Sequence, residues 1–209
     1  NTPTSNTPGE GQFSLFDGPE EQQENGRLDT KKTTHLYQCV NDPVLFEYFL
    51  KELSKQTEVS FDTETTSLNP LDAELVGISF AWSADKAYYL HLADEEVETS
   101  VWLEKLIPFF ENTAVQKIGQ NLKYDIKVLK KYGIEVRGRL FDTMLAHYLI
   151  NPDMRHNMTV LSETYLNYSP IEITQLIGKK GKGQKSMRDV SLTQLTEYAA
   201  EDADITFQL

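Results

Sequence analysis

The chain has 209 residues, which suits one α/β domain with additional segments or at most two small domains. A single cysteine excludes a disulfide framework, and no stretch approaches the roughly 18 apolar residues of a membrane span. We therefore expect a cytoplasmic location and no membrane partner. The net charge of −12 argues against unspecific binding to a polyanion, although part of it would be neutralised if several carboxylates hold cations.

Residues 1–34 differ in composition from the rest of the chain. They are rich in Asn, Thr, Pro, Gly, Glu and Gln, with one brief apolar patch at Phe13, Leu15 and Phe16. Such a segment cannot bury enough apolar surface to offset the entropy cost of ordering it. We predict a disordered or linker segment over residues 1–34 and a single domain over residues 35–209.

The first half of this domain reads mainly as strands. Residues 36–40 predict a strand, and Asn41-Asp42-Pro43 predicts the start of a helix with proline at its first position. A strand over 59–61 runs directly into Asp62. Residues 75–82 and 87–92 predict two strands joined by a turn at 83–86, and 101–110 predict an amphipathic helix.

The second half is mostly helical. After a strand at 115–118, a helix is expected from Asn121 to about residue 132, ended by Gly133. Further helices are predicted at 143–150, 160–165, 171–177 and 191–209, and the low-complexity patch GKKGKGQK occupies 178–185. Strands that come first and then alternate with helices indicate an α/β fold with a central mixed sheet flanked by helices.

Two carboxylates lie two residues apart in the motif Phe61-Asp62-Thr63-Glu64-Thr65. Residues two apart on a strand point to the same face, so Asp62 and Glu64 aim together at the end of an apolar strand. Two such charges repel each other unless a cation or a proton lies between them. Taken alone, a D-x-E pair is more often a solvated strand end than a site.

Two further motifs place carboxylates on helices. In Asn121-Leu122-Lys123-Tyr124-Asp125, Asn121 is a candidate N-cap, and Asp125 follows one turn later on the same face. In the segment Tyr198-Ala199-Ala200-Glu201-Asp202, the i, i+4 spacing stacks Tyr198 and Asp202 on one face. The two alanines between them would let that helix approach the sheet closely. Each motif alone is compatible with an ordinary cap, a core aromatic and surface charges.

In combination and in this order, the three motifs resemble the signature of the DEDD exonuclease superfamily, which has a ribonuclease H-like fold, and the tyrosine marks its DEDDy branch. The blocks VSFDTETTSL, IGQNLKYDIKVLKKYGIEVRG, FDTMLAHYLINPDMRH and YAAEDADITFQL also look like the proofreading domain of bacterial DNA polymerase I. The likeness covers about residues 35–209. It implies a 3′→5′ exonuclease that acts on single-stranded or frayed 3′ ends of DNA, joined to a polymerase domain in the same parent chain.

The resemblance also implies metal ligands and catalytic roles. Two divalent ions, Mg²⁺ or Mn²⁺, would activate water and neutralise charge on the phosphate, because hard oxygen ligands favour these ions. Asp62 would bridge both ions, Glu64 and Asp202 would complete the tighter site, and Asp125 would hold the second ion through water. Tyr198 would orient the attacking water or help to deprotonate it.

The same resemblance implies contacts with DNA. Leu68 would wedge against the terminal base, and the strand would be lined by Thr65, Gln120, Asn121, Tyr124 and Arg155. Thr174 stands in a loop where the family has an aromatic residue, so base stacking would be weaker here or supplied by another residue. The basic cluster in the patch at 178–185, continued by Arg188, is either a solvated loop or a set of phosphate contacts: Lys179, Lys180, Lys182 and Lys185.

Other polar residues are expected to be structural. Asp142 is a candidate N-cap rather than a ligand, Asp204 follows Asp202 too closely to share its face, and no role is assigned to the four histidines. Two alternatives to the main interpretation stay open. One is a DEDDy exoribonuclease that trims RNA 3′ ends, because two-metal chemistry does not require a particular sugar. The other is a non-catalytic domain that positions DNA.

Overall fold

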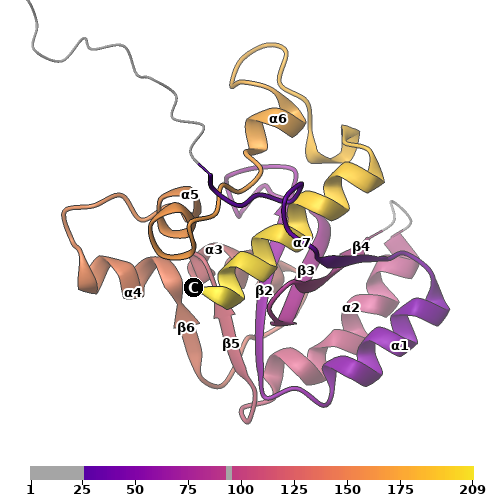
Figure 1. The fold of residues 1–209 in the computed structure, drawn as a ribbon. Coiled ribbons are helices and arrows are strands. Elements are labelled where there is room, and N and C mark those ends of the chain that lie inside the picture. Colours follow the sequence, from indigo (N-terminus) through magenta and orange to yellow (C-terminus); the bar gives the residue numbers. More distant parts are fainter. Residues whose placement is uncertain (1–25, 93–95) are drawn as a thin grey trace, which may run out of the picture.

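The computed structural model describes residues 26–92 and 96–209, and within them six strands form one mixed sheet (Figure 1). The strand order is β1-β4-β3-β2-β5-β6. The bounds are β1 (Leu36–Val40), β2 (Glu58–Thr65), β3 (Leu75–Ser83), β4 (Lys86–His91), β5 (Gln116–Gly119) and β6 (Leu140–Asp142). The predicted strands and the turn at 83–86 are confirmed. Strands β2, β3 and β4 pair antiparallel, whereas β5 pairs parallel to β2 and β6 parallel to β5.

Three helices bury their apolar sides against one face of the sheet: α1 (Pro43–Leu53), α2 (Glu96–Glu111) and α3 (Leu122–Lys131). The core between them is built on aromatic rings, with Phe61 of β2 edge-on to Phe110 of α2 and Phe49 of α1 tilted against Phe80. The predicted cap of α1 is confirmed, since the Asp42 carboxylate accepts hydrogen bonds from two amides of the first turn. Helix α2 begins five residues earlier than the predicted start at 101.

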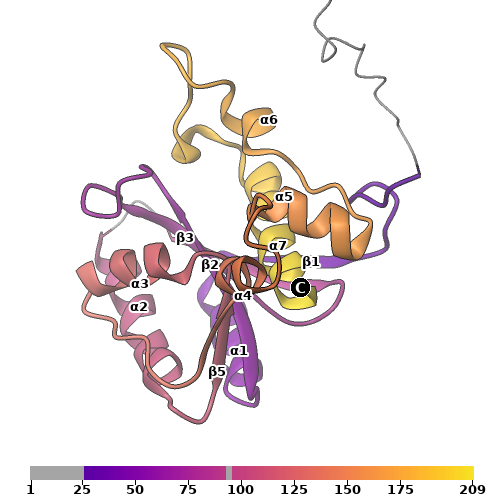
Figure 2. The ribbon, with the colours of Figure 1, turned by 90° about the vertical axis from the view of Figure 1, so that its left-hand side faces the viewer.

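The long helix α7 (Leu192–Gln208) lies on the opposite face and crosses strands β1 to β5. Figure 2 shows α7 on one side of the sheet and α2 and α3 on the other. The contact is lined by small residues, and the Ser60 hydroxyl of β2 donates a 2.6 Å hydrogen bond to the carbonyl of Ala203. The prediction that alanines let this helix approach the sheet closely is therefore confirmed. The close contact fixes α7 relative to the end of β2.

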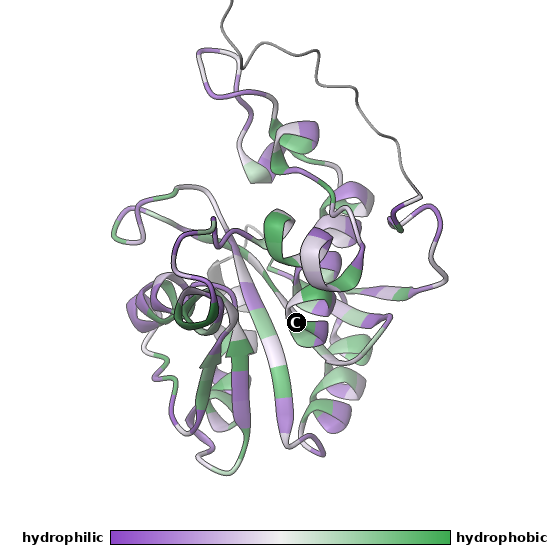
Figure 3. Cartoon of the chain, turned by 60° about the vertical axis from the view of Figure 1, so that its left-hand side comes forward, coloured by the Kyte–Doolittle hydropathy of each residue, from purple (hydrophilic) through white to green (hydrophobic). Residues whose placement is uncertain are grey.

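Short helical segments fill the region between β6 and α7: α4 (Thr143–Ile150), α5 (Met158–Leu161), a π-helix (Ser162–Leu166), α6 (Ile173–Ile177) and a 3₁₀ turn (Met187–Asp189). The helix predicted at 160–165 is thus an α-turn that widens into a π-helix, and the one predicted at 171–177 starts two residues later. The loop above α6, which contains the patch at 178–185, is hydrophilic in Figure 3.

Part of the predicted linker belongs to the folded domain. Residues 1–25 lie outside the described residues, but residues 26–34 contact the segment after α5. Leu28 exchanges backbone hydrogen bonds with Asn167 and Ser169 at 3.0 and 2.8 Å, and Arg27 forms a 2.9 Å ion pair with Glu163. The predicted boundary after residue 34 therefore falls inside the ordered structure, and the composition of residues 26–34 did not reveal these backbone contacts.

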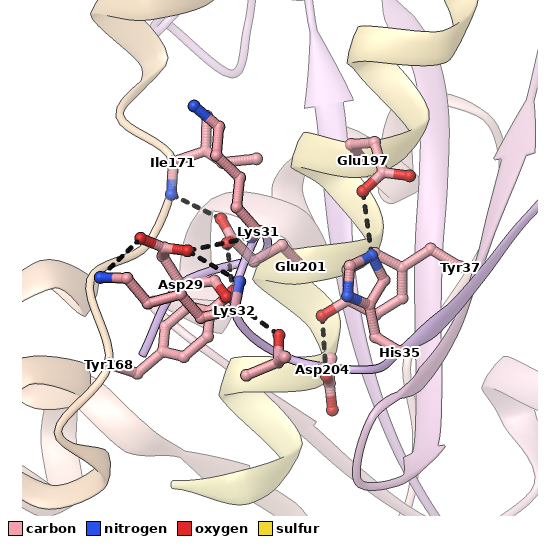
Figure 4. A network of polar contacts seen from close by, with 11 residues as sticks. Asp29, Lys31, Lys32, His35, Tyr37, Tyr168, Ile171, Glu197, Glu201 and Asp204 are labelled. Atoms are coloured by element: carbon pink, nitrogen blue, oxygen red, sulfur yellow. Dashed lines mark hydrogen bonds and ion pairs between the residues drawn. The ribbon is translucent and has the colours of Figure 1, made fainter. Parts of the chain in front are cut away.

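Polar side chains on the outer side of α7 bind β1 and the segment at 168–171 (Figure 4). Glu201 accepts hydrogen bonds from the Tyr168 hydroxyl and the Ile171 amide, both at 2.6 Å. Asp204 accepts one from the Tyr37 hydroxyl at 2.8 Å. Asp204 therefore does not share the face of Asp202, as predicted. Among the described residues no helix combines the length and apolar character that crossing a membrane requires.

Candidate active site

The carboxyl end of β2 presents two carboxylates to α7. Ser60, Asp62 and Glu64 are every second residue of β2, so their side chains lie on the same side of the strand. The hydrogen bond from Ser60 to α7 shows that this side faces α7. Asp202 of α7 completes the group, because Asp62, Glu64 and Asp202 each offer an oxygen and these three atoms lie within 4.8 Å of one another. The predicted convergence of strand and helix carboxylates is present.

Burial, together with the charges of neighbouring carboxylates, raises the pKa of all three groups. Burial and the charges of Asp125, Glu64 and Asp202 raise the pKa of Asp62 well above its ordinary value, and burial with Asp202 does the same for Glu64. The pKa of Asp202 is raised to about 8, mainly by burial and then by the charge of Glu201. The Oε1 atom of Glu64 is buried without a hydrogen-bond partner. A divalent cation would relieve the repulsion and give this oxygen a partner.

The fourth carboxylate, Asp125 of α3, approaches from the other side of β2. Its Oδ1 accepts hydrogen bonds from the Thr63 amide at 3.1 Å and the Thr63 hydroxyl at 2.6 Å. Burial raises the pKa of Asp125 to about 7, although the bonds from Thr63 lower it. Asp125 is not one of the three mutually close carboxylates, in keeping with the separate role that the resemblance implies. The sequence reasoning missed Thr63, because strand alternation places it on the face opposite to Asp62.

The start of α3 is capped differently from the prediction. Asn121 is at the N-cap position in the left-handed conformation (φ 67°), but its side chain makes no capping bond. Instead, the Asp142 carboxylate accepts from the amides of Asn121 and Leu122 at 3.2 and 2.9 Å. Asp142 also caps its own helix α4 through the Leu145 amide, as predicted. The Asp142 carboxylate thus caps both α3 and α4. The Asn121 side chain is not used as a cap, and it lines the cleft instead.

Tyr198 lies one helical turn before Asp202 on α7, and both side chains line the cleft that contains the carboxylates. Burial, followed by the charges of Asp202, Glu64 and Asp62, raises the pKa of Tyr198 well above its ordinary value. The phenol therefore keeps its proton in this environment. Its chemistry at neutral pH is that of a fixed hydrogen-bond donor and acceptor.

The carboxylates lie in a cleft of about 560 Å³. Among the predicted site residues, those lining it are Asp62, Glu64, Thr65, Leu68, Gln120, Asn121, Tyr124, Asp125, Lys185, Tyr198 and Asp202. Tyr124 is held over the cleft by its hydroxyl, which lies 2.5 Å from the Thr65 hydroxyl and also donates to the Ser67 carbonyl. Leu68 is 86% exposed at the rim. Arg155, Lys179, Lys180 and Lys182 are exposed and do not line the cleft.

The far wall of the cleft differs from the expectation for Thr174. This residue belongs to helix α6 rather than to a loop, and its hydroxyl donates to the Glu172 carboxylate at 3.1 Å. The apolar side chains that α6 contributes to the cleft are Ile173 and Ile177. The side chains of α6 that line this wall are therefore aliphatic, whereas the family resemblance implied an aromatic ring.

Two histidines that the sequence left without a role form a contact behind Gln120. The Nδ1 atoms of His147 and His156 lie 2.7 Å apart, so the two rings share one proton between these nitrogens. The Gln120 side-chain amide donates a 2.7 Å hydrogen bond to the His156 carbonyl, and the Thr143 hydroxyl donates one to the side-chain oxygen of Gln120. The pair thus fixes the loop that orients a cleft residue. Nine residues separate the histidines, a spacing that no helix or strand period indicates.

Comparisons with known proteins show the family to which the chain belongs. The sequence profile of the 3′–5′ exonuclease family matches residues 37–209. DNA polymerase I of Pseudomonas aeruginosa is 37% identical over 196 residues, covering 89% of this chain and 21% of the relative. DNA polymerase I of Borreliella burgdorferi is 33% identical over 187 residues, covering 87% of this chain and 20% of the relative. The chain thus spans about a fifth of the length of these relatives.

Solved structures show the same fold at low sequence identity. The catalytic core of RRP6 from Trypanosoma brucei has a TM-score of 0.64 at 17% identity, covering 87% of this chain and 46% of that one. Brucella melitensis NrnC with bound Mg²⁺ has a TM-score of 0.60 at 20% identity, and the match covers 84% of this chain and 78% of that one. Escherichia coli RNase D, an exoribonuclease involved in structured RNA processing, has a TM-score of 0.60 at 16% identity. The match covers 81% of this chain and 42% of that one. The predicted ribonuclease H-like fold is confirmed, and this chain belongs to the 3′–5′ exonuclease family represented in bacterial DNA polymerase I.

Proposed function

We propose that this domain removes nucleotides from the 3′ ends of DNA with the help of two divalent ions, Mg²⁺ or Mn²⁺, and that it proofreads within a longer DNA polymerase. One observation carries the chemistry: three carboxylates from β2 and α7 converge in a cleft where a Glu64 oxygen is buried without a partner. The relatives named DNA polymerase I support DNA as the substrate, and the Mg²⁺ in the NrnC structure supports the choice of ion.

The donor set fits hard divalent cations. Asp62, Glu64 and Asp202 would hold one ion, and Asp125, reaching in from α3, would contribute to the second. All four ligands are carboxylates, which favours Mg²⁺ or Mn²⁺ over softer metals. When bound, such ions supply Lewis acidity that activates water and neutralises charge on the phosphate.

The remaining residues would bind and orient the terminal nucleotide. The Tyr198 hydroxyl, which keeps its proton and lies in the cleft one helical turn before Asp202, would orient the attacking water through a hydrogen bond. Leu68, Ile173 and the Tyr124 ring, which all line the cleft, would offer apolar contact to bases. Because most of these walls are uncharged, the cleft suits unpaired bases more than a rigid duplex.

Degradation of labelled oligonucleotides tests the proposal. We expect the 209-residue chain to release the label immediately from 3′-labelled single-stranded DNA and to produce a ladder from 5′-labelled DNA, with both reactions abolished by EDTA. A mismatched 3′ terminus should be cut faster than a paired one, since unpairing a terminal step costs roughly 1–2 kcal/mol. Release of internal fragments, or equal rates on matched and mismatched ends, would contradict the proposal.

An exoribonuclease is the second candidate, favoured by the structural likeness to RNase D. Side-by-side digestion of DNA and RNA oligonucleotides of one sequence distinguishes the two, and we expect DNA to be the better substrate. The third interpretation, a non-catalytic domain that positions DNA, predicts no Mn²⁺-dependent stabilisation. The complete set of four carboxylates argues against that interpretation.

A further inference from the structure

Gln120 is held in one orientation at the wall of the catalytic cleft. It follows β5 directly and lines the cleft next to Asn121. Its side-chain amide donates a 2.7 Å hydrogen bond to the His156 carbonyl, and its side-chain oxygen accepts from the Thr143 hydroxyl. A carbonyl oxygen can only accept, so the His156 carbonyl determines which end of the Gln120 amide faces it. Because the amide nitrogen carries two hydrogens, a second one remains for an acceptor in the cleft, such as a phosphate oxygen.

The His156 carbonyl is positioned by the side chain of the same residue. His156 lies in the loop between α4 and α5, and its Nδ1 atom lies 2.7 Å from Nδ1 of His147 on α4. The Tyr148 ring of α4 also packs edge-on against the His156 ring, at a centroid distance of 5.2 Å. These two contacts anchor this part of the loop to α4. Helix α4 therefore determines where the carbonyl lies that orients Gln120.

His147 is an unexpected residue for a position that serves packing alone. Its side chain is 3% exposed, and its Nε2 atom is buried without a hydrogen-bond partner. Burial of an unpaired nitrogen carries a free-energy cost that a phenylalanine ring at this position would avoid. The other ring nitrogen, Nδ1, does have a partner, and that partner is His156. The polar chemistry of His147 is thus directed at the loop that orients Gln120.

We propose that His147 is a positioning residue for the binding of single-stranded DNA: through His156 it holds Gln120 with one N–H available to the strand. The inference rests on the proposed function, because it assigns Gln120 a contact with an acceptor atom of the DNA. His147, His156 and Gln120 are not candidate metal ligands. The role therefore concerns binding of the strand rather than the hydrolytic step.

The contact between the two histidines depends on their protonation. With one proton between the two Nδ1 atoms, one ring donates and the other accepts. When both rings are cationic, each Nδ1 carries a hydrogen and the bond is lost. Histidine side chains change their charge in the range of about pH 5 to 8. The bond is therefore present at the upper end of this range and is lost as the pH falls, and the fixed orientation of Gln120 is lost with it.

The segments around the pair carry other titratable or charged side chains: Asp142, Tyr148, Asp153, Arg155, Glu163 and Tyr165. The Tyr165 ring meets His147 edge-on at a centroid distance of 5.6 Å, as Tyr148 meets His156. Asp142 accepts from three backbone amides, and Glu163 pairs with Arg27. Asp153 and Arg155 are exposed. Among the described residues, these carboxylates therefore do not stabilise a second charge on the pair by direct contact.

A double-mutant cycle on DNA binding tests the coupling. The dissociation constant of a short single-stranded DNA is measured in EDTA for the 209-residue chain, His147→Phe, Gln120→Ala and the double variant. Each single variant should raise it by about fivefold, the effect of one hydrogen bond, and the double variant by about the same fivefold. An increase of about 25-fold in the double variant would mean that the two effects are independent, and it would overturn the proposal.

The matched control for this cycle is His35→Phe. The His35 ring lies 3.2 Å from the Glu197 carboxylate on the outer side of α7, and His35 is not among the residues that line the cleft. This variant also exchanges a partly buried imidazole for a phenyl ring and should leave the dissociation constant unchanged.

The pH dependence gives the second arm, which also decides if His147→Phe does not fold. His147→Asn offers an amide oxygen to His156 and does not titrate, so it keeps an acceptor for His156 at low pH. The dissociation constant of the wild type divided by that of His147→Asn should be about one at about pH 8 and about five at about pH 5.5. This ratio cancels the general effect of pH on DNA binding by an acidic chain. A ratio that stays constant over this range would overturn the proposal.

Nuclease activity with Mn²⁺ is measured on the same proteins. If the wild-type chain binds DNA and shows the coupling but does not hydrolyse it, the proposed function fails and the role of His147 in binding stands. If the chain hydrolyses 3′ ends and the two substitutions act independently, the role of His147 fails and the proposed function stands.

Discussion

Asp125 depends on Thr63 for its position in the site. One oxygen of the carboxylate accepts hydrogen bonds from both the amide and the hydroxyl of Thr63, at 3.1 and 2.6 Å, and both residues are buried. The contact crosses from β2 to α3, so it sets where the fourth carboxylate stands relative to the other three. Thr63 is not itself a candidate metal ligand, but it positions the Asp125 carboxylate, which is one.

Thr63→Val should therefore impair both stability and catalysis. The substitution keeps the shape of the side chain but leaves Asp125 with one bond fewer in a buried place, which costs about 1–3 kcal/mol. We expect a lower urea midpoint and a slower single-turnover rate with saturating metal. Thr63→Ser, which retains the hydroxyl, is the control and should recover most of the stability and the rate. Wild-type rates in the valine variant would show that this hydroxyl does not position Asp125.

Asp62→Ala and Asp202→Ala should each reduce nuclease activity by on the order of 10³-fold, because metal ligands supply several kcal/mol of transition-state stabilisation. Without metal the variants should melt no lower than the wild type, since removing one carboxylate relieves repulsion among those that remain. Mn²⁺ should raise the melting temperature of the wild type but not of the variants. Asp153→Ala, an exposed carboxylate outside the cleft, is the control. Retained activity in either cleft variant would refute the ligand assignment.

The stability of the metal-free protein should fall as the pH rises from about 4 to 8. Asp125 and Asp202 have pKa values of about 7 and about 8 in the folded protein, above the ordinary value of 3.8. Within that window the folded state holds more protons than the unfolded state, so the free energy of unfolding decreases with pH, by on the order of 1–3 kcal/mol. Thermal melts in EDTA at about pH 5 and about pH 8 measure the difference. Asp202→Asn should reduce the slope, whereas Glu104→Gln, at an exposed position of α2, should not.

Tyr198→Phe should slow the chemical step by about 100-fold, the lower end of the range for a group that positions a proton in the transition state. The variant keeps the ring and removes only the hydroxyl beside Asp202, so the affinity for DNA should stay nearly constant. Single-turnover kinetics separate the two quantities. An unchanged chemical rate would show that Tyr198 only packs against its neighbours.

Sequence patterns predicted those parts of the site in which both residues belong to the same strand or helix, because the periodicity of that element shows which side chains share a face. Alternation along β2 paired Asp62 with Glu64, and the i, i+4 spacing paired Tyr198 with Asp202. The convergence of these elements was predicted from the family resemblance, whereas the hydrogen bonds between elements that position the site were missed. Asp142 replaces the Asn121 side chain as the cap of α3, and no local pattern indicates that a strand end 21 residues away will accept those amides. The same holds for Thr63 with Asp125 and for the histidine pair, which depend on tertiary packing.

The basic loop gives the last prediction. Replacing Lys179, Lys180, Lys182 and Lys185 with Ser should raise KM for single-stranded DNA and leave the maximal rate nearly intact, because phosphate contacts away from the scissile bond bind ground and transition states equally. Lys185 should account for most of the effect. It is the one of the four that lines the cleft, and its amide is anchored to the Ile177 carbonyl at 2.9 Å.

The salt dependence of binding distinguishes phosphate contact from a nonspecific change in the loop. Removal of one lysine–phosphate interaction should flatten the slope of log K against log salt by about 0.7 for single strands. Lys185→Ser alone should therefore change the slope by about this amount. Replacing Lys51 of α1 and Lys55 just after it with Ser is the control, because neither lysine lines the cleft. If the KM and the slope of the quadruple variant both match those of the wild type, the loop is merely solvated and the acidic cleft binds DNA without it.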